Sequence, residues 1–540
     1  MSETQSVAVA QPTAVHSKLN KSPGAVGMIL FAIVLIGGFA YAGFHLASDL
    51  EGGGHFDTVW PYVLLGVALL TALGFEFVNG FHDTANAVAT VIYTHSMEPH
   101  IAVVWSGMWN LIGVLTSSGA VAFTIISLLP VELILQVGHG AGFAMVFALL
   151  IAAILWNLGT WWLGLPASSS HTLVGSIIGV GIANQLMSPK GSGTSGVDWA
   201  QAGGVFRALL VSPVFGFVLA GALLWTLKKL VKIPELYKAP EGDAPPPFWI
   251  RGLLILTCTG VSFGHGSNDG QKGMGLIMLI LIGTVPTVYA LNHAVGPGQV
   301  QDFAAVSQQA ANVFAGHVAP DTPAVSDPRE DLTNYIRTKN IGPTTLKSAH
   351  DLALQISTNV TDAKSLAAIP ANQQQNVRND MYVEGETLRL MAKSGKPAFS
   401  SAEEAQLSNY HKHLDTATKF IPSWVKVAVA LALGLGTMVG WKRIVVTVGE
   451  KIGKDHLTYA QGASAEIVAA VTIIAADQLH LPVSTTHVLS SGVAGTMVAN
   501  GSGLQWATIR NIAMAWVCTL PAAALLSASL FWILNQFVSH

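Results

Sequence analysis

Two short strings of hydroxyl side chains stand at distant positions in the chain, each behind a Leu-Pro pair and in front of a histidine. The hydroxyl residues are Ser168, Ser169 and Ser170 in the first string and Ser484, Thr485 and Thr486 in the second. Proline suits the first turn of a helix and Ser or Thr caps the free amides there, so each string predicts a helix start. Two facing helix starts would offer hydroxyl donors, free N–H groups and positive dipole ends, which suit a tetrahedral oxyanion. The alternative is that these hydroxyls only join neighbouring helices.

Carboxylates and amides form a second pair of strings. The first of these carries Glu76, Asn79, Asp83 and Asn86, at spacings of three, four and three residues. Such spacings place the four side chains on one face of a helix. A similar string recurs 186 residues later and puts Asp269 in register with Asp83. Ionisable side chains inside membrane helices are costly, so we expect these to pair with one another or to bind a coupling ion. A charge that only reaches the membrane interface is the alternative.

A carboxylate beside an anion site favours phosphate. Monohydrogen phosphate carries a proton and needs an acceptor as well as donors, whereas sulfate has no proton to donate. Asp83 or Asp269 could therefore select phosphate, and hard oxygen ligands could also hold Na⁺ or a divalent ion bound with the phosphate. Histidine, whose unperturbed pKa lies near neutrality, is the obvious proton carrier. The histidines within or beside the strings are His82, His171, His265 and His487. Helix capping or packing is the alternative role for His171 and His487.

The composition indicates that membrane helices position these side chains. Among 540 residues 51% are hydrophobic, only 11% are charged and the mean hydropathy is +0.50, which is too little polar surface for a soluble globule. From Leu133 to Pro189 the chain has no Asp, Glu, Lys or Arg, a length sufficient for two crossings. The net charge of −3, with no basic run, argues against nucleic-acid binding. Cys258 and Cys518 lie in apolar stretches, so neither a disulfide framework nor a cysteine metal site is expected.

Apolar runs predict an all-α membrane protein with about twelve membrane elements, several of them interrupted by Gly, Pro or Ser/Thr. The expected elements are 25–47, 59–81, 100–129, 141–163, 166–187, 205–228, 249–264, 273–293, 422–441, 458–478, 482–500 and 507–537. The run at 25–47 is expected to be a retained helix, with a cleaved signal peptide as the alternative.

The chain is expected to divide into two related halves. Leu165–His171 matches Leu481–His487 at an offset of 316 residues, whereas the acidic strings repeat at an offset of 186. The difference of 130 residues is about the size of a polar, helical stretch in the second half, which is therefore expected to be an insert in the second copy. Repeats with interrupted helices are typical of transporters. The predicted units are an N-terminal extension with an extra membrane helix (1–58), a first repeat (59–230), a linker (231–248), the first part of a second repeat (249–295), the soluble insert (296–421) and the rest of that repeat (422–540).

At these motifs the sequence resembles the inorganic phosphate transporter (Pit) family, and most of all its bacterial low-affinity members. The resemblance covers roughly 59–295 and 422–537. It implies an inverted repeat, a homodimer in the inner membrane of a bacterium, and phosphate held by the six hydroxyls of the two strings. It also implies that Asn-Asp-x-x-Asn motifs supply cation ligands, which here are Asp83, Asn86, Asn268 and Asp269.

Two departures from the family pattern bear on the coupling ion. This chain reads His82-Asp83-x-x-Asn86 and Asn268-Asp269-x-x-Lys272, so one ligand in each copy of the sodium-coupled pattern has changed. The resemblance therefore implies proton symport of phosphate, complexed with Mg²⁺ or another divalent ion. Lys272 could act as a tethered cation, and His82 and Glu76 complete the residues expected in coupling.

The same motifs leave alternative functions to consider: another coupling ion, another substrate, a channel or an enzyme. A sodium-coupled phosphate transporter and a sulfate transporter both keep the fold and change the ion or the substrate. An anion channel would not need duplicated carboxylates, and an enzyme would need a nucleophile with an oriented base, which His171 next to Ser170 does not supply. We expect neither an enzyme nor a bound cofactor or resident metal.

Overall fold

The structure, a computed structural model, describes residues 19, 24–53, 59–83, 85–135, 140–188, 196–240, 242, 244–363 and 365–538. Throughout these residues the regular structure is helical, apart from one isolated bridge between Gly453 and Leu504. The prediction of an all-α protein is confirmed.

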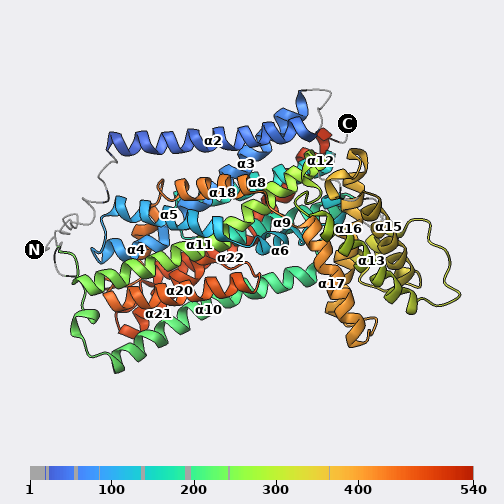
Figure 1. Cartoon of the computed structure of the whole chain (residues 1–540). Coiled ribbons are helices and arrows are strands. Elements are labelled where there is room, and N and C mark those ends of the chain that lie inside the picture. The colour runs from blue at the N-terminus through green and yellow to red at the C-terminus, as the bar shows by residue number, and fades with distance from the viewer. Residues whose placement is uncertain are drawn as a thin grey trace, which may run out of the picture.

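The chain forms two sets of helices that make up the bundle, and the insert interrupts the second set between α12 and α18 (Figure 1). The first set is α2 (Ala25–Gly53), α3 (Trp60–Asp83), α4 (Ala85–Tyr93), α5 (Pro99–Thr116), α6 (Ala120–Ile126), α7 (Val131–Leu135), α8 (Gly140–Trp162), α9 (Ser169–Met187) and α10 (Trp199–Leu230). After the short η1 (Pro234–Tyr237), the second set is α11 (Phe248–Thr284), α12 (Pro286–Tyr289), α18 (Ser423–Gly436), α19 (Lys442–Glu450), α20 (Tyr459–Gln478), α21 (Thr485–Asn500) and α22 (Trp506–Val538).

The insert contains five α-helices that gather at one end of the bundle (Figure 1). They are α13 (Pro297–Gly316), α14 (Pro328–Thr338), α15 (Thr345–Ala363), α16 (Ala371–Ser394) and α17 (Ser401–Thr418), with the short η2 (Leu366–Ala368) before α16. Their apolar faces form a core of their own, in which Phe303, Leu352 and Tyr410 are buried. Asp198, at the start of α10, ties the insert to the bundle through an ion pair with Lys339 at 3.1 Å.

Six described helices are long and apolar enough to cross a membrane, and the number rises to eight if each of two bent pairs is one span. One bent pair is α5 with α6, at 79°, and the other is α17 with α18, at 71°. The predicted segment 100–129 is therefore broken, at Gly119, whose φ of 86° favours glycine. The expected count of twelve is not established by these helices.

The prediction of separate elements at 249–264 and 273–293 was wrong, because α11 runs without interruption from Phe248 to Thr284. Glycines explain how a polar sequence can remain helical here. A Cβ at Gly266 would lie 2.1 Å from the carbonyl oxygen of Asn110, and one at Gly273 would lie 2.2 Å from Cγ of Glu76. Neighbouring helices thus approach α11 closely and satisfy its polar side chains, so the helix does not need to break.

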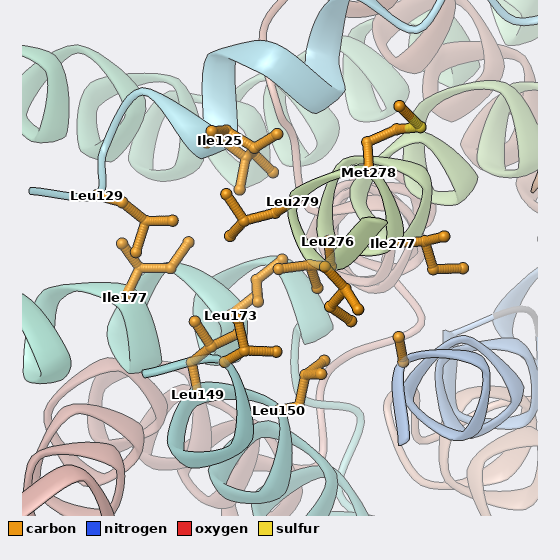
Figure 2. Packing of buried hydrophobic residues seen from close by; sticks show 14 of the residues in the cluster. Ile125, Leu129, Leu149, Leu150, Leu173, Ile177, Leu276, Ile277, Met278 and Leu279 are labelled. Carbon is orange, nitrogen blue, oxygen red and sulfur yellow. The ribbon is translucent and has the colours of Figure 1, made fainter. Parts of the chain in front are cut away.

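Leucine and isoleucine side chains of α6, α8, α9 and α11 pack against one another in one apolar core (Figure 2). Leu149, Leu173, Ile177 and Leu276 are each buried in this core. Packing of this kind holds α9 and α11 in fixed positions relative to each other.

The pair α10 and α21 packs backbone against backbone. A Cβ at Gly216 would lie 2.3 Å from the carbonyl oxygen of Val488, and one at Gly495 would lie 2.0 Å from that of Phe217. Glycine is therefore required on both helices for this close approach.

Candidate functional site

The two hydroxyl strings begin two helices, as the sequence predicted. Ser168 caps α9 and accepts a hydrogen bond from the backbone N–H of His171 at 3.2 Å. Ser484 caps α21 and accepts from the N–H of His487 at 3.1 Å. Both cap residues are buried. Capping on this pattern satisfies one orphan amide at each start and leaves others in the first turn without an intrahelical acceptor.

The starts of α9 and α21 meet in the interior of the protein. Ser170 Oγ of the first string donates to the carbonyl oxygen of Val483, in the loop before the second, at 2.8 Å. The rings of His171 and His487 lie 4.5 Å apart between centroids, and Trp516 stacks on the far side of His487 at 4.1 Å. Two helix starts from distant parts of the sequence therefore share one buried region.

Asp83, the last residue of α3, joins the two strings. Its Oδ1 accepts a hydrogen bond from Thr486 Oγ1 at 2.6 Å, and its Oδ2 accepts one from Ser169 Oγ. His82 Nδ1 lies 3.0 Å from Asp83 Oδ1, while the other nitrogen of that ring lies 3.1 Å from Thr160 Oγ1. One carboxylate thus receives a hydroxyl donor from each helix start.

Lys272 links the second carboxylate to the first string. Its Nζ lies 2.7 Å from Asp269 Oδ2, three residues earlier on α11, and both side chains are fully buried. Nζ also donates to Ser170 Oγ. His265 Nε2 lies 3.6 Å from the same oxygen of Asp269. The ammonium group therefore occupies a position between a carboxylate and the hydroxyls, where it balances the carboxylate charge.

Glu76 reaches the site through Asn79. The Asn79 side chain donates to Glu76 Oε2 at 3.3 Å, and its Oδ1 lies 2.7 Å from Ser169 Oγ, so it competes with Asp83 for the one hydroxyl proton of Ser169. Asn268 instead holds the loop before α21, since its Nδ2 donates to the carbonyl oxygen of Leu481 at 3.1 Å. The side chain of Asn86, which was also expected in this site, lies outside the described residues.

The six hydroxyls differ in what they can offer a ligand. Ser168 and Ser484 are engaged as caps, and Ser170 donates to a carbonyl. Ser169 and Thr486 donate to Asp83, whose carboxylate would compete with any anion for them. Thr485 Oγ1 is buried and has no hydrogen-bond partner in the described part of the protein. A buried hydroxyl without a partner is unfavourable, so Thr485 is the donor most ready for a ligand.

The structure also brings together three potential metal ligands, of which one, His265, was not expected beside the two carboxylates. Ligand atoms of Asp83, His265 and Asp269 all lie within 4.8 Å of one another. Two carboxylates and an imidazole form a donor set that several divalent ions accept. His265 was a candidate only as a proton carrier, and no spacing in the sequence signals its proximity to Asp83, 182 residues away.

Residues 79–527 match the model of the phosphate transporter family. The chain belongs to this family. It is 44% identical over 496 residues to the low-affinity inorganic phosphate transporter PitA of Escherichia coli K12, covering 88% of this chain and 97% of the relative. It is 42% identical over 500 residues to PitB of the same strain, covering 89% and 98%. The resemblance found in the sequence is confirmed, and the chain is a multi-pass membrane transporter of phosphate rather than an enzyme.

Among solved structures the chain aligns with "The sodium-dependent phosphate transporter" at a TM-score of 0.47 and 19% identity, covering 88% of this chain and 99% of that one. At that similarity neither the coupling ion nor the mechanism transfers to this chain.

Proposed function

We propose that this chain imports inorganic phosphate across a bacterial inner membrane by proton symport, with the anion bound between the starts of α9 and α21. One observation carries the proposal: Asp83 accepts hydroxyl hydrogen bonds from both starts. A carboxylate that shares its donors with the substrate links phosphate binding to its own protonation.

The coupling follows from competition for two hydroxyl donors. Ionised Asp83 holds Ser169 and Thr486, so these donors are not available to an anion. A proton on Asp83 weakens both hydrogen bonds and releases the hydroxyls to phosphate, while Thr485 and the first-turn amides add further donors. By thermodynamic linkage, phosphate then favours the protonated carboxyl to the same extent.

Lys272 supplies the positive charge that a coupling cation would otherwise bring. Its ammonium group lies 2.7 Å from Asp269 and donates to Ser170 beside the anion site. A phosphate oxyanion placed between the two helix starts would lie near this charge. Free sodium is therefore not required, in contrast to a motif with Asn at this position.

We further propose that the transported species is phosphate with a divalent ion such as Mg²⁺. The ligand atoms of Asp83, His265 and Asp269 lie within 4.8 Å of one another, and Asp269 with His265 could hold the ion as part of the cargo while Asp83 carries the proton. Lys272 shares Asp269 with this group, so the ion and the ammonium group would divide that carboxylate between them. We also propose that the protein forms a homodimer, as the family resemblance implies.

Uptake by purified protein in liposomes tests the proposal. Radiolabelled phosphate uptake is measured with a pH gradient, Na⁺ and Mg²⁺ imposed separately, and unlabelled sulfate is added as a competitor. We expect uptake that follows the pH gradient, increases with Mg²⁺, needs no Na⁺ and resists sulfate. Asp302→Asn, at an exposed carboxylate of the insert, is the matched control for Asp83→Asn. Uptake driven by Na⁺ alone, or flux indifferent to both gradients, would establish sodium symport or a channel instead.

A further inference from the structure

A cleft of about 450 Å³ lies where the insert meets the membrane helices. Ser118 and Gly119, at the break between α5 and α6, line one side of it, and His480, just before the second hydroxyl string, lines another. The insert contributes Arg389 and Lys419. The cleft therefore approaches both the broken helix and the loop that leads into α21.

Ion pairs line the part of the cleft that the insert provides. Lys419 Nζ lies 2.8 Å from Asp415 Oδ1, and Arg389 Nε lies 2.7 Å from Glu386 Oε2. The side chains of the first pair are 24% and 36% exposed, and those of the second pair 24% and 7%. The pair of Lys419 and Asp415 remains in contact with water, and such ion pairs are weak, so a mobile anion can compete for Lys419. Lys419 is thus able to bind phosphate in this cleft, whereas Arg389 stays paired with the buried Glu386.

A layer of hydrogen bonds involves residues that are close in the chain to both the cleft and the phosphate site. Gln271 Oε1 accepts from the backbone N–H of Val121, at the start of α6, at 2.9 Å. Its Nε2 donates to Asp477 Oδ1 at 2.6 Å, and Ser267 Oγ donates to Asp477 Oδ2 at 2.7 Å. These bonds connect α6, α11 and the last turn of α20.

Residues of this layer are close in the chain both to the lining of the cleft and to the site. Val121 follows Gly119 and Ala120, both of which line the cleft, and the carbonyl of Asp477 accepts from the N–H of His480, another lining residue, at 3.0 Å. Gln271 directly precedes Lys272, which belongs to the site. Gln271 is fully buried. Gln271 and Asp477 therefore connect the lining of the cleft with Lys272 of the site.

We propose that the cleft is the route of phosphate on the insert side, and that the layer of Gln271, Asp477 and Ser267 is the gate that closes the site against it. This inference rests on the proposed phosphate site. The hydrogen bonds of the gate join three helices, so opening requires α6 or α20 to part from α11. Asp477 is the centre of the gate because it accepts from two partners.

Thiol labelling from the insert side tests the gate without measuring transport. The background lacks both cysteines, Cys258→Ala and Cys518→Ala. Thr485→Cys reports from behind the gate, Ser118→Cys reports from the cleft, and Ser401→Cys, at the exposed start of α17, reports which vesicle orientation presents the insert. A membrane-impermeant maleimide is applied without phosphate.

We expect Ser118→Cys to react quickly and Thr485→Cys slowly in vesicles that present the insert. Asp477→Asn removes the charge that strengthens two hydrogen bonds, and should increase the labelling rate of Thr485→Cys about tenfold while leaving that of Ser118→Cys unchanged. Gln271→Glu places a second carboxylate next to Asp477 and should have the same effect. Two independent variants are used so that a folding defect in one of them does not decide the result. Unchanged labelling of Thr485→Cys in both variants, or a Ser118→Cys that reacts only from the opposite side, would overturn the gate.

The same design separates the gate from the proposed function. Labelling needs no phosphate, so a protein that fails to transport phosphate can still show the gated pattern. If Thr485→Cys labelling responds to Asp477→Asn but phosphate does not slow it, the gate stands and the phosphate site is elsewhere. If phosphate protects Thr485→Cys yet neither gate variant changes the rate, the site stands and the gate is refuted.

Discussion

Replacing Lys272 by Asn tests whether the ammonium group takes the place of a free cation. The substitution removes a charge that lies 2.7 Å from Asp269 Oδ2 and leaves that carboxylate fully buried without its partner. It also restores the Asn-Asp-x-x-Asn pattern. Breaking a buried ion pair from one side costs about 3–5 kcal/mol. That free energy corresponds to roughly a hundredfold or larger change in an equilibrium constant.

We expect the Lys272→Asn variant to lose proton-driven uptake by about this factor in the absence of Na⁺. Added Na⁺ should restore part of the uptake, because the cation can bind Asp269 and the new amide oxygen and so repair the charge imbalance. The assay is initial uptake of radiolabelled phosphate into proteoliposomes at matched protein content, with choline replacing Na⁺ in the reference condition.

Three further variants make the result specific. Lys272→Met removes the charge without adding an oxygen ligand, so Na⁺ should not restore its uptake. Lys272→Arg keeps the charge and should keep some Na⁺-independent uptake. Lys426→Asn is the matched control, since Lys426 is a partly buried lysine whose Nζ donates to the carbonyl oxygen of Ser117, outside the site. Full Na⁺-independent uptake by Lys272→Asn, or equal Na⁺ stimulation of the Met and Asn variants, would refute the tethered-cation reasoning.

Three more outcomes follow from the geometry. Thr485→Ala removes a hydroxyl that has no partner in the described residues, so it should raise the KM for phosphate roughly tenfold to hundredfold without lowering the Tm of the phosphate-free protein, whereas Thr485→Ser should not. Asp83→Asn and Asp269→Asn should each abolish accumulation driven by a pH gradient, and wild-type accumulation by either would make that carboxylate structural. Burial, with nearby Asp380, raises the pKa of the Glu384 carboxyl in the folded protein well above its usual 4.5. The contribution of Glu384 to the insert's free energy of unfolding should therefore be complete below pH 4.5 and should decrease as the pH rises toward the folded-state pKa. Hydrogen exchange of α16, corrected for intrinsic rates, should show this fall in the full chain and lose it in Glu384→Gln.

The helix starts were predictable because their signals are local. Proline followed by a capping hydroxyl fixes where α9 and α21 begin, whatever packs around them. A spacing of three residues also puts Lys272 and Asp269 on one face of a helix, and the structure brings them into contact.

The parts that could not be predicted depend on distant segments. The polar composition near Asp269 suggested a break in the helix, but α11 is continuous. It can stay helical because its glycines let α3 and α5 pack closely against it, and hydropathy does not predict such packing. The pairing of Gln271 with Asp477 spans 206 residues and follows no repeated motif, so nothing in the sequence singles out either residue. The His171 to His487 contact was not foreseen either, although both residues were named as candidates.

The glycines between α10 and α21 have a mechanical consequence. Because the two backbones are in close contact at Gly216 and Gly495, we expect α10 and α21 to move together as one rigid unit. The N-terminal end of α21 carries the hydroxyls of Thr485 and Thr486. At the start of α10, Asp198 caps the helix and holds Lys339 of the insert. A shift of α21 would therefore move α10 with it, and with α10 the contact between Asp198 and the insert.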